Sequence, residues 1–336
     1  MIIPIINYSA LEFWLDGTDK YDFFVKKGIS DLSPHFPFSI SKRLAENLAK
    51  EYHLSMPISL MSPRKKKRRA NNTYHLFSYP VSLPPNSFIE LTDHFGETVL
   101  VSSPENCFLY AASKLPFYEV VRIGCMLCGI FVLDKTQKMQ QRSRIPLTNK
   151  KKIQRYLQSA QGMKGIKTAL TAINYVVDNC NSPMEVSLAV LSCLPFSRGG
   201  YALETPVMNK ILRLSSSISN RINIGKIRGD LVWENQKVVI EYDSNLSHLE
   251  KNQHEYDKKR ASAITLSGYQ LVNLTYGQLT SFSAVEETFL MIRHLLGMKK
   301  SSAKLKQYED VRWETVHELL LKKKSLQQIL FDPRWF

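Results

Sequence analysis

The sequence predicts an α/β protein, with an α+β N-terminal part followed by a C-terminal mixed β-sheet flanked by helices. Three observations predict this class. Hydrophobic residues make up 44% of the 336 residues, enough to form a packed core. Segments with helical spacing of apolar residues alternate with short apolar runs bounded by turn residues. Towards the C-terminus, a hairpin, a helix and another strand follow in the order expected of a βαβ crossover.

The first 150 residues carry mixed signals and are expected to form one α+β domain. A helix is predicted over 41–54, and two more are predicted over 103–133, where Ser103 is a candidate N-cap and Pro104 the first helical residue. Residues 134–150 are polar and predicted to be a loop or linker. Strands are predicted over 56–62, 73–81, 87–93 and 97–103.

The remaining residues are expected to form a helical connector over 151–180, a second domain over 181–298 and a basic tail over 299–336. The second domain starts with a helix announced by Ser182 and Pro183. Its later elements are predicted to be a hairpin over 227–243, a helix over 247–268, a strand over 269–275 and a helix over 283–297.

Composition limits the class of partner. Lys and Arg number 45 against 30 Asp and Glu, which gives a net charge of +15. Such an excess favours a polyanionic partner, most often nucleic acid, although a soluble basic surface is the simpler alternative. Five cysteines, an odd and sparse set, favour a reducing compartment, and the C-x-x-C of Cys125 and Cys128 is interpreted as buried thiols rather than a zinc site. With no targeting segment or apolar run of 18 residues, a cytoplasmic protein without membrane contact is expected.

The segment from Ile227 to Asp243 places several acids in one hairpin. A turn over Glu234–Lys237 would pair Asp230 with Glu241. Because side chains alternate between the two faces of a strand, Leu231, Trp233, Val238, Ile240 and Tyr242 are predicted to share one face. The other face is predicted to carry Asp230, Val232, Val239, Glu241 and Asp243.

Like charges opposite one another destabilise a sheet, so this acidic cluster needs compensation. A divalent cation, Mg²⁺ or Mn²⁺, held by Asp230, Glu241 and Asp243 is one answer, because hard oxygen ligands suit these ions. Arg or Lys partners are an alternative, and a solvent-facing hairpin end is another. His248 follows the strand closely enough to reach the same place.

The helix after the hairpin carries Asp257 and Arg260 at i, i+3, as supporting residues of the site or as a surface ion pair.

The pattern D-x(10)-E-Y-D-x(4)-H, then D-x-x-R, then G-Y-x-L-V-x-L-T, resembles the very-short-patch-repair-like endonuclease domains of the PD-(D/E)XK nuclease superfamily. The resemblance covers about residues 182–296 and implies a restriction-endonuclease-like fold. In that family an upstream S-P-x-E helix contributes an acid, and Glu185 occupies that position. Ser182 and Glu185 also have capping-box spacing, which requires no chemistry. Asp243 stands where the superfamily usually has a lysine, whose role would pass to His248, Lys251 or Lys258 or remain unfilled.

The resemblance implies Mg²⁺-dependent hydrolysis of DNA. Asp230 and Glu241 would ligate the ion, assisted by Asp243 or Glu185, with His248 as general acid and Arg260 orienting Asp257 or contacting phosphate. Many such nucleases act as homodimers. Two alternatives are an inactive nuclease fold that binds DNA as an antitoxin-type regulator, and an RNA nuclease.

Residues from about 88 to 180 more weakly resemble AbiEi-type antitoxin proteins, which implies phage defence or a mobile element and a toxin or defence-system partner. The basic run of Arg64, Lys65, Lys66, Lys67, Arg68 and Arg69 is predicted to grip DNA phosphates. A nuclear-localisation signal and a solvated loop are the alternatives for this run.

Overall fold

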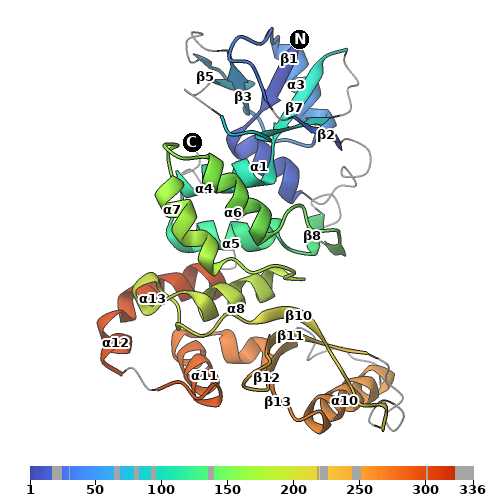
Figure 1. Ribbon diagram of the computed structural model, residues 1–336, viewed down its shortest axis with the longest axis vertical. Coiled ribbons are helices and arrows are strands. Elements are labelled where there is room, and N and C mark those ends of the chain that lie inside the picture. Colours follow the sequence, from blue (N-terminus) through green and yellow to red (C-terminus); the bar gives the residue numbers. More distant parts are fainter. Residues whose placement is uncertain are drawn as a thin grey trace. The chain divides into compact units, whose positions relative to one another are not determined.

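The computed structural model describes residues 1–16, 25–29, 31–63, 69–78, 83–91, 96–134, 140–217, 219, 226–243, 251–299 and 302–321 (Figure 1). Contacts divide the chain into two compact units, Met1–Asn174 and Tyr175–Lys324. The division falls inside the predicted connector, so residues 151–174 belong to the first unit and residues 175–180 to the second. In the described part of the chain, no helix combines the length and hydropathy needed to cross a bilayer.

The first unit is built on a seven-stranded mixed sheet with strand order β2-β6-β7-β1-β3-β5-β4. Its strands are β1 (Ile2–Ile5), β2 (Val25–Ile29), β3 (Ile58–Ser62), β4 (Arg69–Ala70), β5 (Tyr74–Ser78), β6 (Phe88–Leu91) and β7 (Thr98–Ser102). The predicted strands in 56–103 are confirmed as β3, β5, β6 and β7. The central strand β1, which pairs with β7 in parallel and β3 antiparallel, is not among the predicted strands.

The helices of the first unit are α1 (Asn7–Leu15), α3 (Lys42–Glu51), α4 (Pro104–Ala112), α5 (Phe117–Leu127), α6 (Lys150–Ser159), α7 (Ile166–Ala172) and the short η1 (Ile173–Tyr175). Ser103 caps α4 as predicted, since its Oγ accepts the N–H of Asn106. The prediction fails after Leu127, where a two-stranded sheet of β8 (Phe131–Asp134) and β9 (Gln140–Ser143) replaces helix and loop. All five cysteines are buried and none forms a disulfide bond, so the prediction of buried thiols at Cys125 and Cys128 is confirmed.

The second unit contains α8 (Pro183–Cys193), η2 (Phe196–Arg198), β10 (Val207–Leu212), β11 (Ile227–Trp233), β12 (Val238–Asp243), α10 (Lys251–Leu266), β13 (Gln270–Thr275), η3 (Tyr276–Leu279), α11 (Phe282–Leu295), α12 (Ser302–Gln307), α13 (Glu309–Val316) and the π-helical turn η4 (His317–Leu321). Its four-stranded sheet has the order β10-β11-β12-β13. Edge strand β10 is not among the predicted elements.

The three pairs of the hairpin nearest the turn form in the predicted register, but the ladder does not extend to the predicted pair Asp230 and Glu241. Trp233 lies opposite Val238, and Leu231 lies opposite Ile240, on either side of a turn over residues 234–237. Strand β13 runs parallel to β12, from the pair Val238 and Gln270 onwards, so the predicted βαβ crossover is also confirmed. The fold is therefore α/β with a mixed sheet, in which the first half of β11 lies beside the end of β12, where Tyr242 donates to Asp230.

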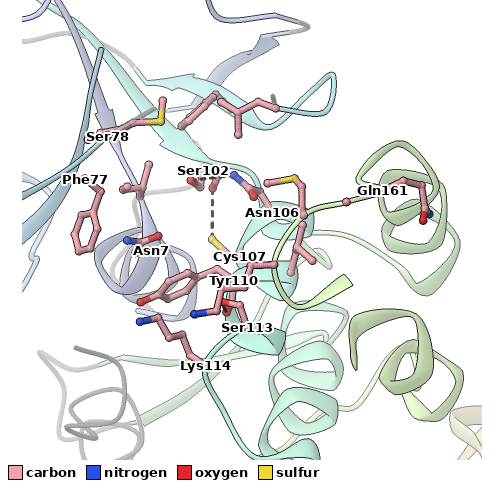
Figure 2. Close-up of a pocket in the computed structure, with 18 residues that line it drawn as sticks. Asn7, Phe77, Ser78, Ser102, Asn106, Cys107, Tyr110, Ser113, Lys114 and Gln161 are labelled. Carbon is pink, nitrogen blue, oxygen red and sulfur yellow. Dashed lines mark hydrogen bonds between the residues drawn. The ribbon is translucent and has the colours of Figure 1, made fainter. Parts of the chain in front are cut away.

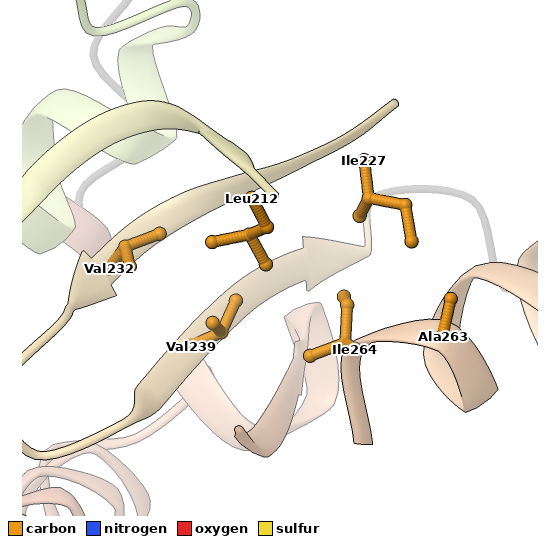
Figure 3. Close-up of a cluster of buried hydrophobic side chains, with 6 residues drawn as sticks. All are labelled: Leu212, Ile227, Val232, Val239, Ala263 and Ile264. Carbon is orange, nitrogen blue, oxygen red and sulfur yellow. The ribbon is translucent and has the colours of Figure 1, made fainter. Parts of the chain in front are cut away.

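One apolar cluster joins this sheet to α10 (Figure 3). Its buried members are Leu212, Ile227, Val232, Val239, Ala263 and Ile264. Ile227 and Val232 are an odd number of residues apart on the same strand, yet both belong to the cluster. A regular strand would place them on opposite faces, so the alternation of β11 is interrupted between them.

Gly229 locates the interruption more closely. A Cβ atom built on Gly229 would lie 2.7 Å from Cγ1 of Val239 and 2.8 Å from Cγ2 of Val232, so this glycine faces the same cluster. The break therefore falls at Asp230 and Leu231. The glycine leaves room for two β-branched side chains beside the first acid of the hairpin.

The segment predicted to be a basic tail contributes to the core of the second unit. Arg312, on α13, is 1% exposed and forms an ion pair with Glu286 of α11 at 2.7 Å between Nη2 and Oε1. Its guanidinium also lies 5.9 Å from the ring centre of Phe196. Residues 302–321 thus pack against the unit and extend it beyond the predicted end at residue 298.

We expect Gly229→Ala to destabilise the second unit by about 1–3 kcal/mol, because valine side chains have little freedom to move away from the added methyl group. Urea unfolding followed by circular dichroism measures the change. Gly277→Ala is the matched control, since its Cβ would meet only Oγ1 of Thr275 at 3.7 Å. Equal unfolding free energies for the two variants would contradict the packing described for Gly229.

Candidate active site

Glu185 lies in the first turn of α8 and is 5% exposed. Ser182 caps the helix by accepting the N–H of Glu185 at 3.1 Å, which is one half of the capping box that the spacing suggested. The carboxylate itself accepts the N–H of Asn181 at 2.8 Å and the side-chain N–H of Asn209, on β10. Glu185 is therefore held by two donors, and its Oε2 atom points towards the sheet rather than into solvent.

The environment of Glu185 disfavours its charge. Burial is the main cause that raises its pKa to about 7, and the negative charge of Asp230 acts in the same direction, while hydrogen bonds from Asn181 and Asn209 oppose the shift. A carboxyl group whose pKa lies near neutrality is typical of functional sites, although buried structural networks also produce such shifts.

Asp230 lies at the interruption of β11 and is partly buried. Its Oδ2 atom accepts the backbone N–H of Tyr242, on β12, at 3.0 Å. Burial raises the pKa of Asp230, and the Tyr242 hydrogen bond and the charges of Arg260 and Arg228 oppose this. Because the strand is irregular here, alternation does not assign Asp230 to the face of Val232 as the sequence predicted.

Glu241 lies one residue beyond the last hairpin pair. Nη2 of Arg260, on α10, lies 2.6 Å from its Oε1 atom, and the same Nη2 also donates to the carbonyl oxygen of Arg228. An arginine partner for the hairpin acids was one of the alternatives that the sequence left open, and it is realised at Glu241. Asp243 ends β12 opposite Thr275 and is partly buried.

The carboxylates of the site can be compared with the ligands that a divalent cation requires. Among the described residues, no three His, Cys, Asp or Glu side chains come together as metal ligands, so Asp230, Glu241 and Asp243 do not form the predicted cluster. Mg²⁺, however, commonly uses only one or two carboxylates with waters and substrate phosphates. Asn209, which donates to Glu185, lies in β10 between the pairs Met208–Leu231 and Lys210–Gly229, across from Asp230, so these two acids would suit such a site.

Several predicted residues lie outside the described part. His248 belongs to residues 244–250, and Lys65, Lys66, Lys67 and Arg68 belong with Arg64 to residues 64–68. Asp257 and Lys251 lie in α10, and Arg69 lies in β4, but their side chains are outside the part of the chain that the structure describes. Lys258 is exposed.

The sequence did not single out Asn209. It adopts a left-handed backbone conformation, with φ of 51°, which Asn tolerates better than most residues. From this position in β10 it donates to Glu185 and to the carbonyl oxygen of Asn179. Sequence offers no signal for this contact, because β10 itself is not among the predicted strands.

Comparisons with protein-family models, curated proteins and solved structures find no match for this chain. The chemistry of the site therefore rests on its own geometry.

Replacing Glu185 should change how stability depends on pH. Its pKa is about 7 when folded against an ordinary value of 4.5, so its stabilising contribution is complete below pH 4.5 and is lost as pH rises through about 7. Between these pH values, we expect the free energy of unfolding to fall by roughly 3 kcal/mol more in the wild type than in Glu185→Gln.

Urea unfolding at pH 4.5 and pH 7.5 measures this difference. Glu314→Gln, at an exposed position on α13, is the control and should follow the wild type. Parallel pH profiles for the wild type and Glu185→Gln would show that Glu185 ionises normally in the folded chain.

Proposed function

We propose that the second unit is a Mg²⁺-dependent DNA endonuclease. The observation that carries the proposal is the proximity of two acids, Glu185 and Asp230. The amide of Asn209 that donates to Glu185 comes from β10, at the position between Met208 and Lys210, which lie opposite Leu231 and Gly229 on either side of Asp230. When both carboxylates are ionised, there is repulsion between them. A divalent cation would relieve it, and the net charge of +15 favours a polyanionic substrate.

Glu185 and Asp230 would hold the ion. When bound, Mg²⁺ supplies polarisation of the phosphate and a water of lowered pKa. Asn181, Asn209 and Tyr242 orient the two carboxylates through the hydrogen bonds described above. Each of these donors also favours the ionised form of its acceptor, so together they prepare both acids to bind a cation.

We expect the arginines beside the acids to bind a phosphate group of the substrate. Arg228 is exposed next to Asp230, and Arg260 holds Glu241. A DNA phosphate bound beside Asp230 and Glu241 would contact at least one guanidinium group. The N–H groups of a guanidinium suit bidentate hydrogen bonding to phosphate oxygens. Protonation of the leaving oxygen is assigned to His248 on the sequence pattern alone.

A second candidate function is DNA binding without cleavage. The Glu241–Arg260 ion pair favours it, because an arginine neutralises one of the acids that the family resemblance assigns to the metal. Arg260 would have to leave Glu241 before that carboxylate could bind a cation. In this case the unit would act as a regulator, consistent with the antitoxin-like resemblance of the first unit.

Cleavage of supercoiled plasmid with Mg²⁺, Mn²⁺ or EDTA separates the two functions. We expect nicking that requires the metal and that falls at least about 100-fold in Asp230→Asn and in Glu185→Gln, because removal of a ligand takes away several kcal/mol of transition-state stabilisation. Glu234→Gln is the control, since this acid lies in the hairpin turn and pairs with Lys210. Mobility shift without cleavage would favour the regulator, and cleavage that survives both active-site changes would remove these acids from the mechanism.

The basic run is tested by salt dependence. Neutral replacement of Arg64–Arg69 should flatten the plot of log affinity for DNA against log salt concentration, by about 0.9 for each phosphate that the chain no longer neutralises. Fluorescence anisotropy with a labelled duplex measures the slope. An unchanged slope would exclude this run from the DNA interface.

A further inference from the structure

The first unit contains a cavity of about 820 Å³ that plays no part in the proposed cleavage (Figure 2). It lies between the start of α1, strands β3, β5, β6 and β7, helix α4 and residues 161–164 after α6. Its volume falls within the range of roughly 300–1,000 Å³ that is typical of small-molecule sites.

The inner wall of the cavity is apolar and chemically neutral. Phe77, Phe88 and Leu109 line it, together with the thiol of Cys107. Cys107 is 1% exposed, and its Sγ atom lies 3.6 Å from the carbonyl oxygen of Ser102. Burial raises the pKa of this thiol, so it stays protonated at neutral pH and serves as an apolar surface rather than as a nucleophile.

Among the described residues that line the cavity, the charged ones are all lysines. Lys114 and Lys164 are exposed at its edge, and none of the lining residues that the structure describes is acidic. Figure 2 shows the ends of Asn7, Tyr110 and Lys114 on the same side of the cavity. An anionic group would find cations and hydrogen-bond donors at this side of the cavity.

Asn7 adds a second observation. It is the first residue of α1 and has a left-handed backbone, with φ of 55°. The nine-residue helix that begins here also directs the positive end of its dipole to the side of the cavity lined by Ile6 and Asn7.

We propose that this cavity binds a small amphipathic anion. An aliphatic or aromatic body would lie against Phe77, Phe88 and Leu109, and a single carboxylate or phosphate would face Lys114 and Lys164. This binding site is independent of DNA cleavage, because all of its residues belong to the first unit.

The test uses two fluorescent probes with the full-length chain: the anion 8-anilinonaphthalene-1-sulfonate and the neutral N-phenyl-1-naphthylamine. Saturable binding of both is expected. The double variant Lys114→Met, Lys164→Met should lower the affinity for the anionic probe about five- to tenfold and leave the affinity for the neutral probe unchanged. Met163→Trp, which places a larger side chain in the cavity, should lower the affinity for both probes.

The control is Lys151→Met, Lys167→Met, which removes two exposed lysines of the same unit that do not line the cavity. Cooperative thermal unfolding of each variant verifies its fold, and the exposed lysine variants keep the test decisive if Met163→Trp fails to fold. Equal affinity of both lysine variants for the anionic probe, or no saturable binding by the folded chain, would overturn the proposal. Competition with decanoate and with adenosine monophosphate assigns the anion as carboxylate or phosphate, and displacement by neither would also contradict it.

Discussion

The candidate site of the second unit depends on two carboxyl groups, Glu185 and Asp230, which the fold brings near one another through Asn209 and β10 and which are buried or partly buried. Glu185 and Asp230 come from a helix and a strand far apart in the sequence, and burial raises the pKa of both. Each accepts a backbone N–H that favours its ionised form, from Asn181 and from Tyr242. The fold therefore holds these acids in place while their repulsion still raises the pKa of Glu185, which is the arrangement a divalent cation would stabilise.

The acids Glu185 and Glu241 lie in different environments. Glu241 has an arginine partner in Arg260, whereas Glu185 is held by amide donors. This division explains why the donor set differs from the one that the sequence predicted. It also defines the choice between the two functions: hydrolysis needs the Glu185–Asp230 pair to accept a cation, and DNA binding alone requires only the arginines and the basic surface.

Much of this fold could be predicted because it depends on local rules. The hairpin register follows from period-two alternation and a four-residue turn, and the helix starts at Ser103 and Ser182 follow from capping. Strands β1 and β10 were not predicted because strand formation depends largely on the neighbours that a segment meets in the sheet. Alternation could not assign the face of Asp230 for a related reason, since the packing of Gly229 against Val232 and Val239 is a tertiary contact that local sequence does not reveal.

The central claim is that Glu185 and Asp230 together bind a divalent cation. Anomalous diffraction from crystals soaked in Mn²⁺ tests it most directly. We expect a peak about 2.0–2.3 Å from a carboxylate oxygen of each residue, and loss of that peak in crystals of Asp230→Asn. A fully occupied arginine or lysine side chain between the two carboxylates, with no anomalous peak at saturating Mn²⁺, would contradict it.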